Sequence, residues 1–265
     1  MMTLHPRNAP VCAVFFVVCL FCSAVHAALP DEIQVYVDDI HEPGRFGLEL
    51  HVNTTPNGIS TPEYPGEVVD AGGTRITPEF AYGLPHDLEA GAYLPVVHES
   101  NGDVRATGIK LRLKWVPIKQ PDEGPGIFAG LNGELSQVRY QFESDRRGLE
   151  LRPIIGWRNT EWLVAANPVL DFALQGPDRH EAPDFAPSLK VARTVAPGIS
   201  TGVEYYTQLG TINDIRPWSQ TQETLYWAID IDRPPWNVNL AIGRGLTAIT
   251  DRWTVKMIIE IPLGR

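Results

Sequence analysis

Apolar and polar residues alternate with a period of two near the end of the chain. Two such runs follow one another, and their apolar positions are Trp236, Val238, Leu240, Ile242, Trp253, Val255, Met257, Ile259 and Ile261. The positions between them are mostly polar or small, as at Asn237 and Lys256. A period of two is typical of a β-strand with one apolar face. Repeated through a secreted chain, it predicts a barrel that meets lipid outside and is polar inside.

The same alternation recurs earlier in the chain. The candidate strands cover residues 45–55, 80–84, 88–94, 109–115, 127–142, 148–157, 162–172, 185–194, 199–209 and 223–232. Several of them have the roughly 9–11 residues with which a tilted strand crosses a membrane. Together with the two final runs, they predict an all-β fold: an antiparallel up-and-down transmembrane β-barrel of about 12 strands.

The connections between these strands alternate in length. Short breaks fall at 85–87, 159–161, 196–198 and 233–235, and longer ones at 56–73, 175–184 and 210–222. Bacterial barrels have short periplasmic turns and longer outer loops, so the alternation assigns each break to a rim. The break at 118–125 is the exception, because it is long where a short turn is expected. Local breaks are also predicted at Pro78, Pro153, Pro168 and Pro187, since proline donates no ladder hydrogen bond.

The start of the sequence predicts a secretory signal peptide over residues 1–27. Arg7 precedes an apolar run at 11–22, and small residues follow up to a cleavage point between Ala27 and Ala28. All three cysteines lie inside this segment, so the mature chain is expected to have neither disulfides nor thiolate metal sites. We therefore expect residues 28–265 to form a single barrel domain in the outer membrane.

Charge narrows the choice of partners. The formal net charge is −10, and removal of Arg7 with the signal makes the chain more acidic. This argues against nucleic acid as a partner. The expected partners are outer-membrane lipid, the barrel-assembly machinery and a small solute. No cofactor is predicted, and the oligomeric state stays open.

Charged residues dominate the face opposite the apolar one. Lys110, Arg112 and Lys114 alternate with leucines, and three glutamates occupy the same parity on earlier strands. A barrel places these groups in its lumen, where enclosed charges need partners. The predicted lumen charge network consists of Glu49, Glu79, Glu89, Lys110, Arg112, Lys114, Glu150, Arg152, Asp171, Lys190, Glu204, Asp230, Lys256 and Glu260.

Aromatic residues of the apolar parity lie near predicted strand ends. Tryptophan and tyrosine gather at the two membrane–water interfaces. The residues predicted to do so are Trp115, Trp162, Tyr205, Trp236 and Trp253.

Catalytic and metal-binding patterns were weighed against plainer explanations. A lipid hydrolase would need serine, histidine and an orienting residue together, but neither His51 nor His98 lies in a recognisable motif. Acidic clusters at 178–184 and 38–42 resemble ordinary solvated loops more than cation sites. No enzymatic activity, catalytic residue or metal site is predicted.

Several stretches resemble a known family of proteobacterial outer-membrane proteins, the transporter group named for the phenol-degradation pathway. They are EIQVYVDDIHEPGRFGLELHVNTT, PEFAYGL, LEAGAYLP, GLELRPIIGWR, NPVLDFAL, GVEYYTQLG and IGRGLTAITDRWTVKM. The resemblance spreads over most of the mature chain and rests on strand patterning and turn chemistry. It therefore implies architecture and location more than activity.

Three functional hypotheses follow. The first is an outer-membrane barrel that forms a narrow channel or transporter for a small solute, or serves as a structural envelope protein. The second is a soluble periplasmic β-sandwich or lipocalin-like binding protein, with its apolar faces packed inward. The chain ends Ile261 to Arg265 without the terminal aromatic residue common in outer-membrane barrels, and this keeps the periplasm open. The third is a barrel lipid hydrolase.

Overall fold

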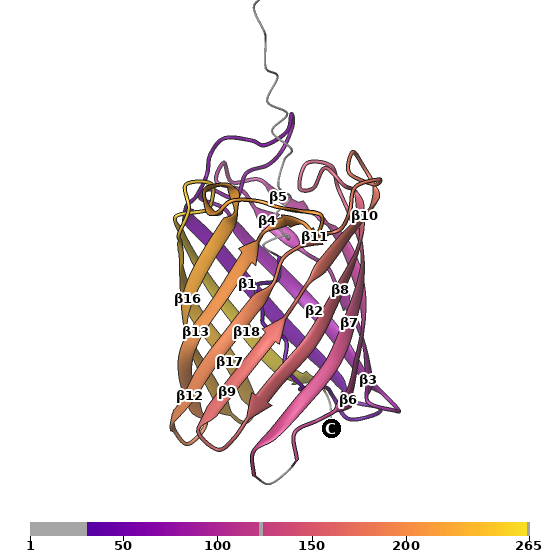
Figure 1. Ribbon diagram of the computed structural model, residues 1–265, viewed down its shortest axis with the longest axis vertical. Helices are drawn as coiled ribbons and strands as arrows, with labels where there is room; N and C mark the ends of the chain where they lie inside the picture. The colour runs from indigo at the N-terminus through magenta and orange to yellow at the C-terminus, as the bar shows by residue number, and fades with distance from the viewer. Residues whose placement is uncertain (1–30, 122–123, 264–265) are drawn as a thin grey trace, which may run out of the picture.

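The computed structural model describes residues 31–121 and 124–263. Its strands form a closed antiparallel barrel (Figure 1). Closure joins the first strand, β1 (Phe46–Asn57), to the last, β18 (Trp253–Leu263), in a register that runs from Phe46 opposite Leu263 to Thr54 opposite Val255. The predicted signal peptide and its cleavage point at Ala27 and Ala28 lie outside the described residues.

The described residues make twelve barrel strands, which confirms the fold predicted from the alternation. Several of these strands are interrupted and so comprise two short elements. Between β1 and β18 the elements are β2 (Thr74–Leu84), β3 (Leu88–Tyr93) with β4 (Val96–His98), β5 (Val104–Ala106) with β6 (Gly108–Ile118), β7 (Gly126–Val138), β8 (Arg147–Arg158), β9 (Trp162–Asn167) with β10 (Leu170–Gln175), β11 (Asp184–Phe185) with β12 (Ser188–Ala196), β13 (Ile199–Gln208) with β14 (Gly210–Thr211), β16 (Gln222–Arg233) and β17 (Trp236–Gly245). A short β15 (Asp214–Ile215) pairs with β14, and a single 3-10 turn, η1 (Trp218–Gln220), precedes β16.

The two ends of the barrel differ in the length of their connections. Long loops gather at the upper end in Figure 1, here called the loop rim, and shorter turns at the lower end, here called the turn rim. The predicted turn at 85–87 is a tight hairpin in which His86 and Asp87 adopt positive φ angles of 65° and 60°. The break at 119–125 lies on the turn rim and is longer than its neighbours there, as the sequence indicated.

Apolar side chains face outward and charged ones face inward. On β6, Leu111, Leu113 and Trp115 are about half exposed, at 54%, 50% and 48%. Lys110, Arg112 and Lys114, which alternate with them, are each 7% exposed. This arrangement is the reverse of a soluble sandwich, where the apolar faces would be buried. It is the pattern expected of a wall between lipid and a polar lumen.

The prediction of four proline breaks is half right. Pro168 and Pro187 lie in the gaps between β9 and β10 and between β11 and β12. Pro78 and Pro153 instead lie inside unbroken strands, so the prediction there was wrong. Each leaves its own strand intact, and the interruption falls on the neighbouring strand, at 94–95 and 168–169 respectively. Each interrupted stretch contains a proline of its own, Pro95 or Pro168, which has no N–H to donate to the ladder. None of the described residues belongs to a helix long and apolar enough to cross a membrane.

Candidate functional site: the charged lumen and its N-terminal plug

The lumen wall contains all of the charged residues that the alternation assigned to it. Strand pairing sets several of them side by side, because directly opposed residues on neighbouring strands share one face. Arg112 lies opposite Glu134, Glu134 opposite Glu150, and Glu150 opposite Asp171. This row crosses four strands of the wall.

Arg112 is the centre of the first charge cluster. Its guanidinium donates to Glu79 Oε1 at 2.6 Å and to Glu89 Oε1 at 2.7 Å. All three side chains are at most 5% exposed. Two buried carboxylates therefore share one cation.

A second cluster lies across the barrel on β12, β13, β16 and β18. Lys256 Nζ donates to Glu204 Oε2 at 2.5 Å, and Lys190 Nζ lies 3.2 Å from Glu204 Oε1. Lys190 also donates to Asp230 Oδ1 at 2.8 Å. Glu204 is 1% exposed and hence joins two lysines in the interior.

The other predicted lumen residues form smaller groups. Arg152 binds Glu150 through two parallel bonds of 2.7 and 2.9 Å. Lys110 pairs with Glu134 at 3.1 Å, and Asp171 borders the same small cavity as Glu150. Glu134 was missed in the sequence, although it occupies the inward parity of β7.

Residues 31–45 run through the lumen from the loop rim to the turn rim, and we call them the plug. At the loop rim Asp31 Oδ1 accepts a bond of 3.0 Å from Arg75 Nη1. At the turn rim the carbonyl of Glu42 lies against Gly83, so close that a Cβ there would meet its oxygen at 2.1 Å. The plug then leads directly into β1. The acidic residues at 38–42 resemble a solvated loop in the sequence, and their pattern does not predict a plug.

The wall binds the middle of the plug mainly through the plug's own backbone. Asn167 donates from Nδ2 to Tyr36 O at 3.0 Å and accepts from Tyr36 N at 2.6 Å, as a neighbouring strand would. Three basic side chains surround the Tyr36 ring, with Arg152 at 4.5 Å and Lys114 at 4.9 Å from its centroid. Cation–π contacts of this kind strengthen where water is excluded.

Near the turn rim the plug is held by ion pairs. Arg158 Nη2 donates to Asp38 Oδ1 at 2.8 Å. His41 binds Glu89 through its ring Nδ1 at 2.5 Å, and its Nε2 lies 3.4 Å from Glu260 Oε1. The contacts with Glu260 and then Glu89 raise the pKa of His41 to about 10, because both carboxylates favour the charged imidazole. Glu260 of the predicted network therefore binds the plug as well as the wall.

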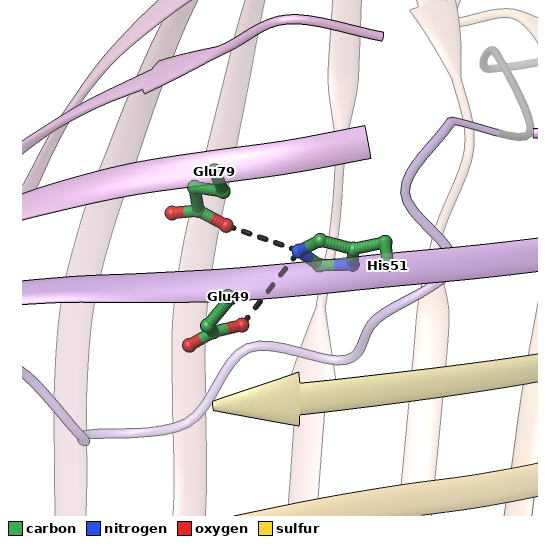
Figure 2. A group of neighbouring side chains, drawn as sticks. All are labelled: Glu49, His51 and Glu79. Atoms are coloured by element: carbon green, nitrogen blue, oxygen red, sulfur yellow. Dashed lines mark hydrogen bonds and ion pairs between the residues drawn. The ribbon is translucent and has the colours of Figure 1, made fainter. Parts of the chain in front are cut away.

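One group of side chains in the wall could offer a metal three ligand atoms. Figure 2 shows His51 between Glu49 and Glu79, with its Nε2 3.1 Å from Glu79 and 3.7 Å from Glu49. Among the described residues this is the only set of three or more histidine, cysteine or acidic ligands so close together. Neither acidic loop weighed in the sequence forms one. Arg112 also binds Glu79, so a protein cation already compensates charge there.

The histidines named for a hydrolase do not share a site. His51 is completely buried, and its ring contacts carboxylates. His98 is exposed at the end of β4, near the loop rim. These positions give no support to a shared catalytic group.

A cavity of about 560 Å³ lies beside the plug toward the turn rim. Plug residues such as Tyr36 and Asp39 form one side of it, and the wall forms the other with Arg158, Lys190 and Glu204. Both signs of charge border it. The space is that of a small polar solute, so the plug fills only part of the lumen at this level.

The aromatic residues predicted at the interfaces lie on the outside of the wall. Trp162 and Trp236 begin strands at the turn rim, and Trp115 ends near it on β6. Trp253 begins β18 at the loop rim, while Tyr205 is half-buried in the outer half of β13. Both rims thus contain at least one of these side chains.

Comparisons with known proteins agree with this architecture. No protein-family model matches the sequence, and no curated protein matches it. The COG4313 outer membrane channel from Pseudomonas putida F1 has a similar structure, with a TM-score of 0.59 and 12% identity, over 88% of this chain and 100% of that one. The KdgM porin gives a TM-score of 0.52 at 9% identity, covering 82% of this chain and 99% of its own. The NanC porin gives 0.50 at 8%, covering 83% and 100%. The expected likeness to outer-membrane barrels is confirmed at the level of the fold.

Proposed function

We propose that the chain is an outer-membrane channel for a small polar solute, closed at rest by its own plug. The observation that carries the proposal is the course of residues 31–45 through a lumen whose wall has charges of both signs. A barrel of about eight strands has room only for side chains, whereas open pores have 16–18 strands. Twelve strands give an intermediate lumen, and here a chain segment occupies it.

Several observations support the membrane setting and the direction of the barrel. The exterior of β6 is apolar along its length, and the short turns lie at one rim as they do on the periplasmic side of bacterial barrels. The sequence resemblance to the transporter group named for phenol degradation, and the fold shared with channel proteins, support transport over a structural role. The lipid and assembly partners expected from the sequence belong to this proposal.

Planar-bilayer recording tests the proposal. The wild-type protein should first show a heat-dependent gel shift, which identifies a folded barrel. It should then conduct only in rare openings, since the plug runs through the lumen and narrows it. Asn167→Ala removes both bonds to the Tyr36 backbone and should raise the open probability several-fold.

The matched control is Asn101→Ala. Asn101 lies in the exposed loop between β4 and β5, and its hydrogen bonds are confined to that loop. This variant should behave like the wild type. A large steady wild-type conductance that Asn167→Ala leaves unchanged would show that the plug does not close the pore, and a soluble protein without a gel shift would end the membrane proposal.

A further inference from the structure

The plug places a carboxylate in a well-formed site at the turn rim. Asp38 Oδ1 accepts from Arg158 Nη2 at 2.8 Å, and Asp38 Oδ2 accepts from the backbone N–H of Gln120 at 3.1 Å. Asp38 is only 8% exposed. Both carboxylate oxygens are thus bound, one by a guanidinium and one by a main-chain donor, a combination that binds carboxylates strongly.

Gln120 belongs to the turn at 119–125, whose length was the exception in the alternation of short and long connections. A turn of two or three residues would be enough to connect β6 to β7, as the tight turn at 85–87 connects β2 to β3. The longer turn supplies the N–H that binds Asp38. Its length therefore has a role in this site.

Lys114 completes the positive side of the site. Its Nζ donates to the main-chain oxygen of Asp39 at 2.6 Å, and Arg158 lies 3.8 Å from the Asp39 carboxylate. In the described chain, the ion pairs and hydrogen bonds of Lys114 and Arg158 go to the plug alone. By contrast, Arg112 and Arg152 each bind a glutamate of the wall.

This difference decides what happens when the plug moves. Arg112 and Arg152 would keep their carboxylate partners, and Lys114 would keep Glu89 opposite it on β3, but Arg158 would lose its carboxylate partners in the plug. Arg158 is 30% exposed and its guanidinium fork fits a carboxylate, so another carboxylate is expected to replace the one that leaves. Both cations already border the cavity of about 560 Å³ beside the plug. A small solute in that cavity is therefore next to them.

We propose that Arg158, Lys114 and the Gln120 N–H form a binding site for a small organic carboxylate, and that Asp38 occupies it until such a solute displaces it. The solute would then release the plug from the wall, so the transported class and the opening signal would be the same. Opening of the channel by the solute rests on the proposed channel function, whereas the carboxylate site itself rests on the Asp38 contacts.

Two substitutions at one ion pair test the proposal with succinate as the probe. Asp38→Asn and Arg158→Gln each remove the same pair, so both should loosen the plug. Their effects on succinate should be opposite. Asp38→Asn removes the charged competitor and should tighten succinate binding about tenfold, whereas Arg158→Gln removes the receptor and should weaken it at least about tenfold, the size of one charge-assisted hydrogen bond.

Controls separate the site from general charge. Lys119→Gln alters an exposed lysine of the same turn that pairs with Asp87, and it should leave succinate binding at the wild-type value. Succinamide, a neutral analogue of similar shape, should not bind measurably. Arg158→Lys keeps the charge but not the guanidinium fork, so its affinity should lie between the wild type and Arg158→Gln. If Arg158→Gln shows no heat-dependent gel shift and hence forms no folded barrel, Arg158→Lys replaces it in the test.

Calorimetry on the full detergent-folded chain measures binding, and bilayer recording measures opening. Opposite shifts for the two variants, with succinate raising the wild-type open probability, support the proposal. Shifts of the succinate affinity in the same direction for both variants, or equal binding of succinamide, would show that the Asp38–Arg158 pair only holds the plug in place. Either result would overturn the proposed carboxylate site. If the binding pattern holds but no protein conducts, the channel function fails while the carboxylate site stands. If the protein conducts but succinate does not bind, the carboxylate site fails alone.

Discussion

Arg112 should be the single most costly lumen side chain to remove. Among the described residues it is the only arginine or lysine that pairs with Glu79, and it shares Glu89 with His41 of the plug. Arg112→Met keeps much of the side-chain volume but removes the guanidinium. Glu79 then keeps its contact with His51 at 3.1 Å, and Glu89 keeps its hydrogen bonds to His41 of the plug.

The expected loss follows from the burial of the group. Removal of one partner from a buried ion pair costs about 3–5 kcal/mol, because the other charge stays buried without compensation. The three side chains here are 5%, 2% and 3% exposed, so little water reaches them. We therefore expect Arg112→Met to lower the free energy of unfolding by about 3–5 kcal/mol.

A triple variant checks the cause. Arg112→Met with Glu79→Gln and Glu89→Gln removes the cation and both charges it neutralises, and apolar or neutral replacement of a whole buried pair is often close to neutral. It should recover most of the loss. Urea unfolding of the detergent-folded barrel, followed by tryptophan fluorescence, gives the free energies. The reasoning is refuted if Arg112→Met costs less than about 1 kcal/mol, the usual size for an exposed pair, or if the triple variant is no more stable than the single one.

Two further predictions concern the outer surface and the plug. Leu113→Arg places a charge in the middle of the outward face of β6, and in lipid it should lower the free energy of unfolding by about 2–4 kcal/mol. The same change at a surface position of a soluble protein would alter that free energy by about 0.5 kcal/mol or less. Unfolding of the barrel in lipid vesicles measures the difference. The raised pKa of His41 means that its contribution to plug docking is complete below its ordinary value of about 6.5 and is lost as pH rises toward about 10. The open probability should therefore rise between pH 6.5 and 9 in the wild type, and the rise should be absent in His41→Gln, with a flat wild-type profile contradicting the assignment.

The wall could be predicted from the sequence because its information is local. A period of two decides which side chains share a face, and antiparallel neighbours joined by short turns are adjacent in the barrel. Lys110, Arg112 and Lys114 could therefore be assigned to the lumen from the alternation over residues 109–115 alone. The predictions at Pro78 and Pro153 were wrong because each interruption falls on the neighbouring strand, which the proline's own strand does not determine.

The plug could not be predicted because its partners are remote. Residues 33–37 show apolar positions at Ile33, Val35 and Val37, a pattern that a barrel strand would also show. The structure satisfies this backbone with side chains instead of a ladder. Asn167, which acts as the neighbouring strand for Tyr36, is 131 residues away. The available sequence signal for the plug was the number of acidic residues at 31–42. Carboxylates enclosed in a barrel need cations beside them, whereas those of a solvated loop do not.

The way in which the wall holds the plug also determines which substitutions are informative. Lys256 donates to the carbonyl of Ile33 at 2.7 Å, Arg152 to that of Gln34 at 3.1 Å, and Lys114 to that of Asp39 at 2.6 Å. Backbone acceptors persist whatever side chain the plug has at these positions. Substitutions within the plug at 33 or 34 should therefore leave these three bonds in place. The plug is better weakened from the wall, or at Asp38 and His41, where its side chains themselves form the bonds.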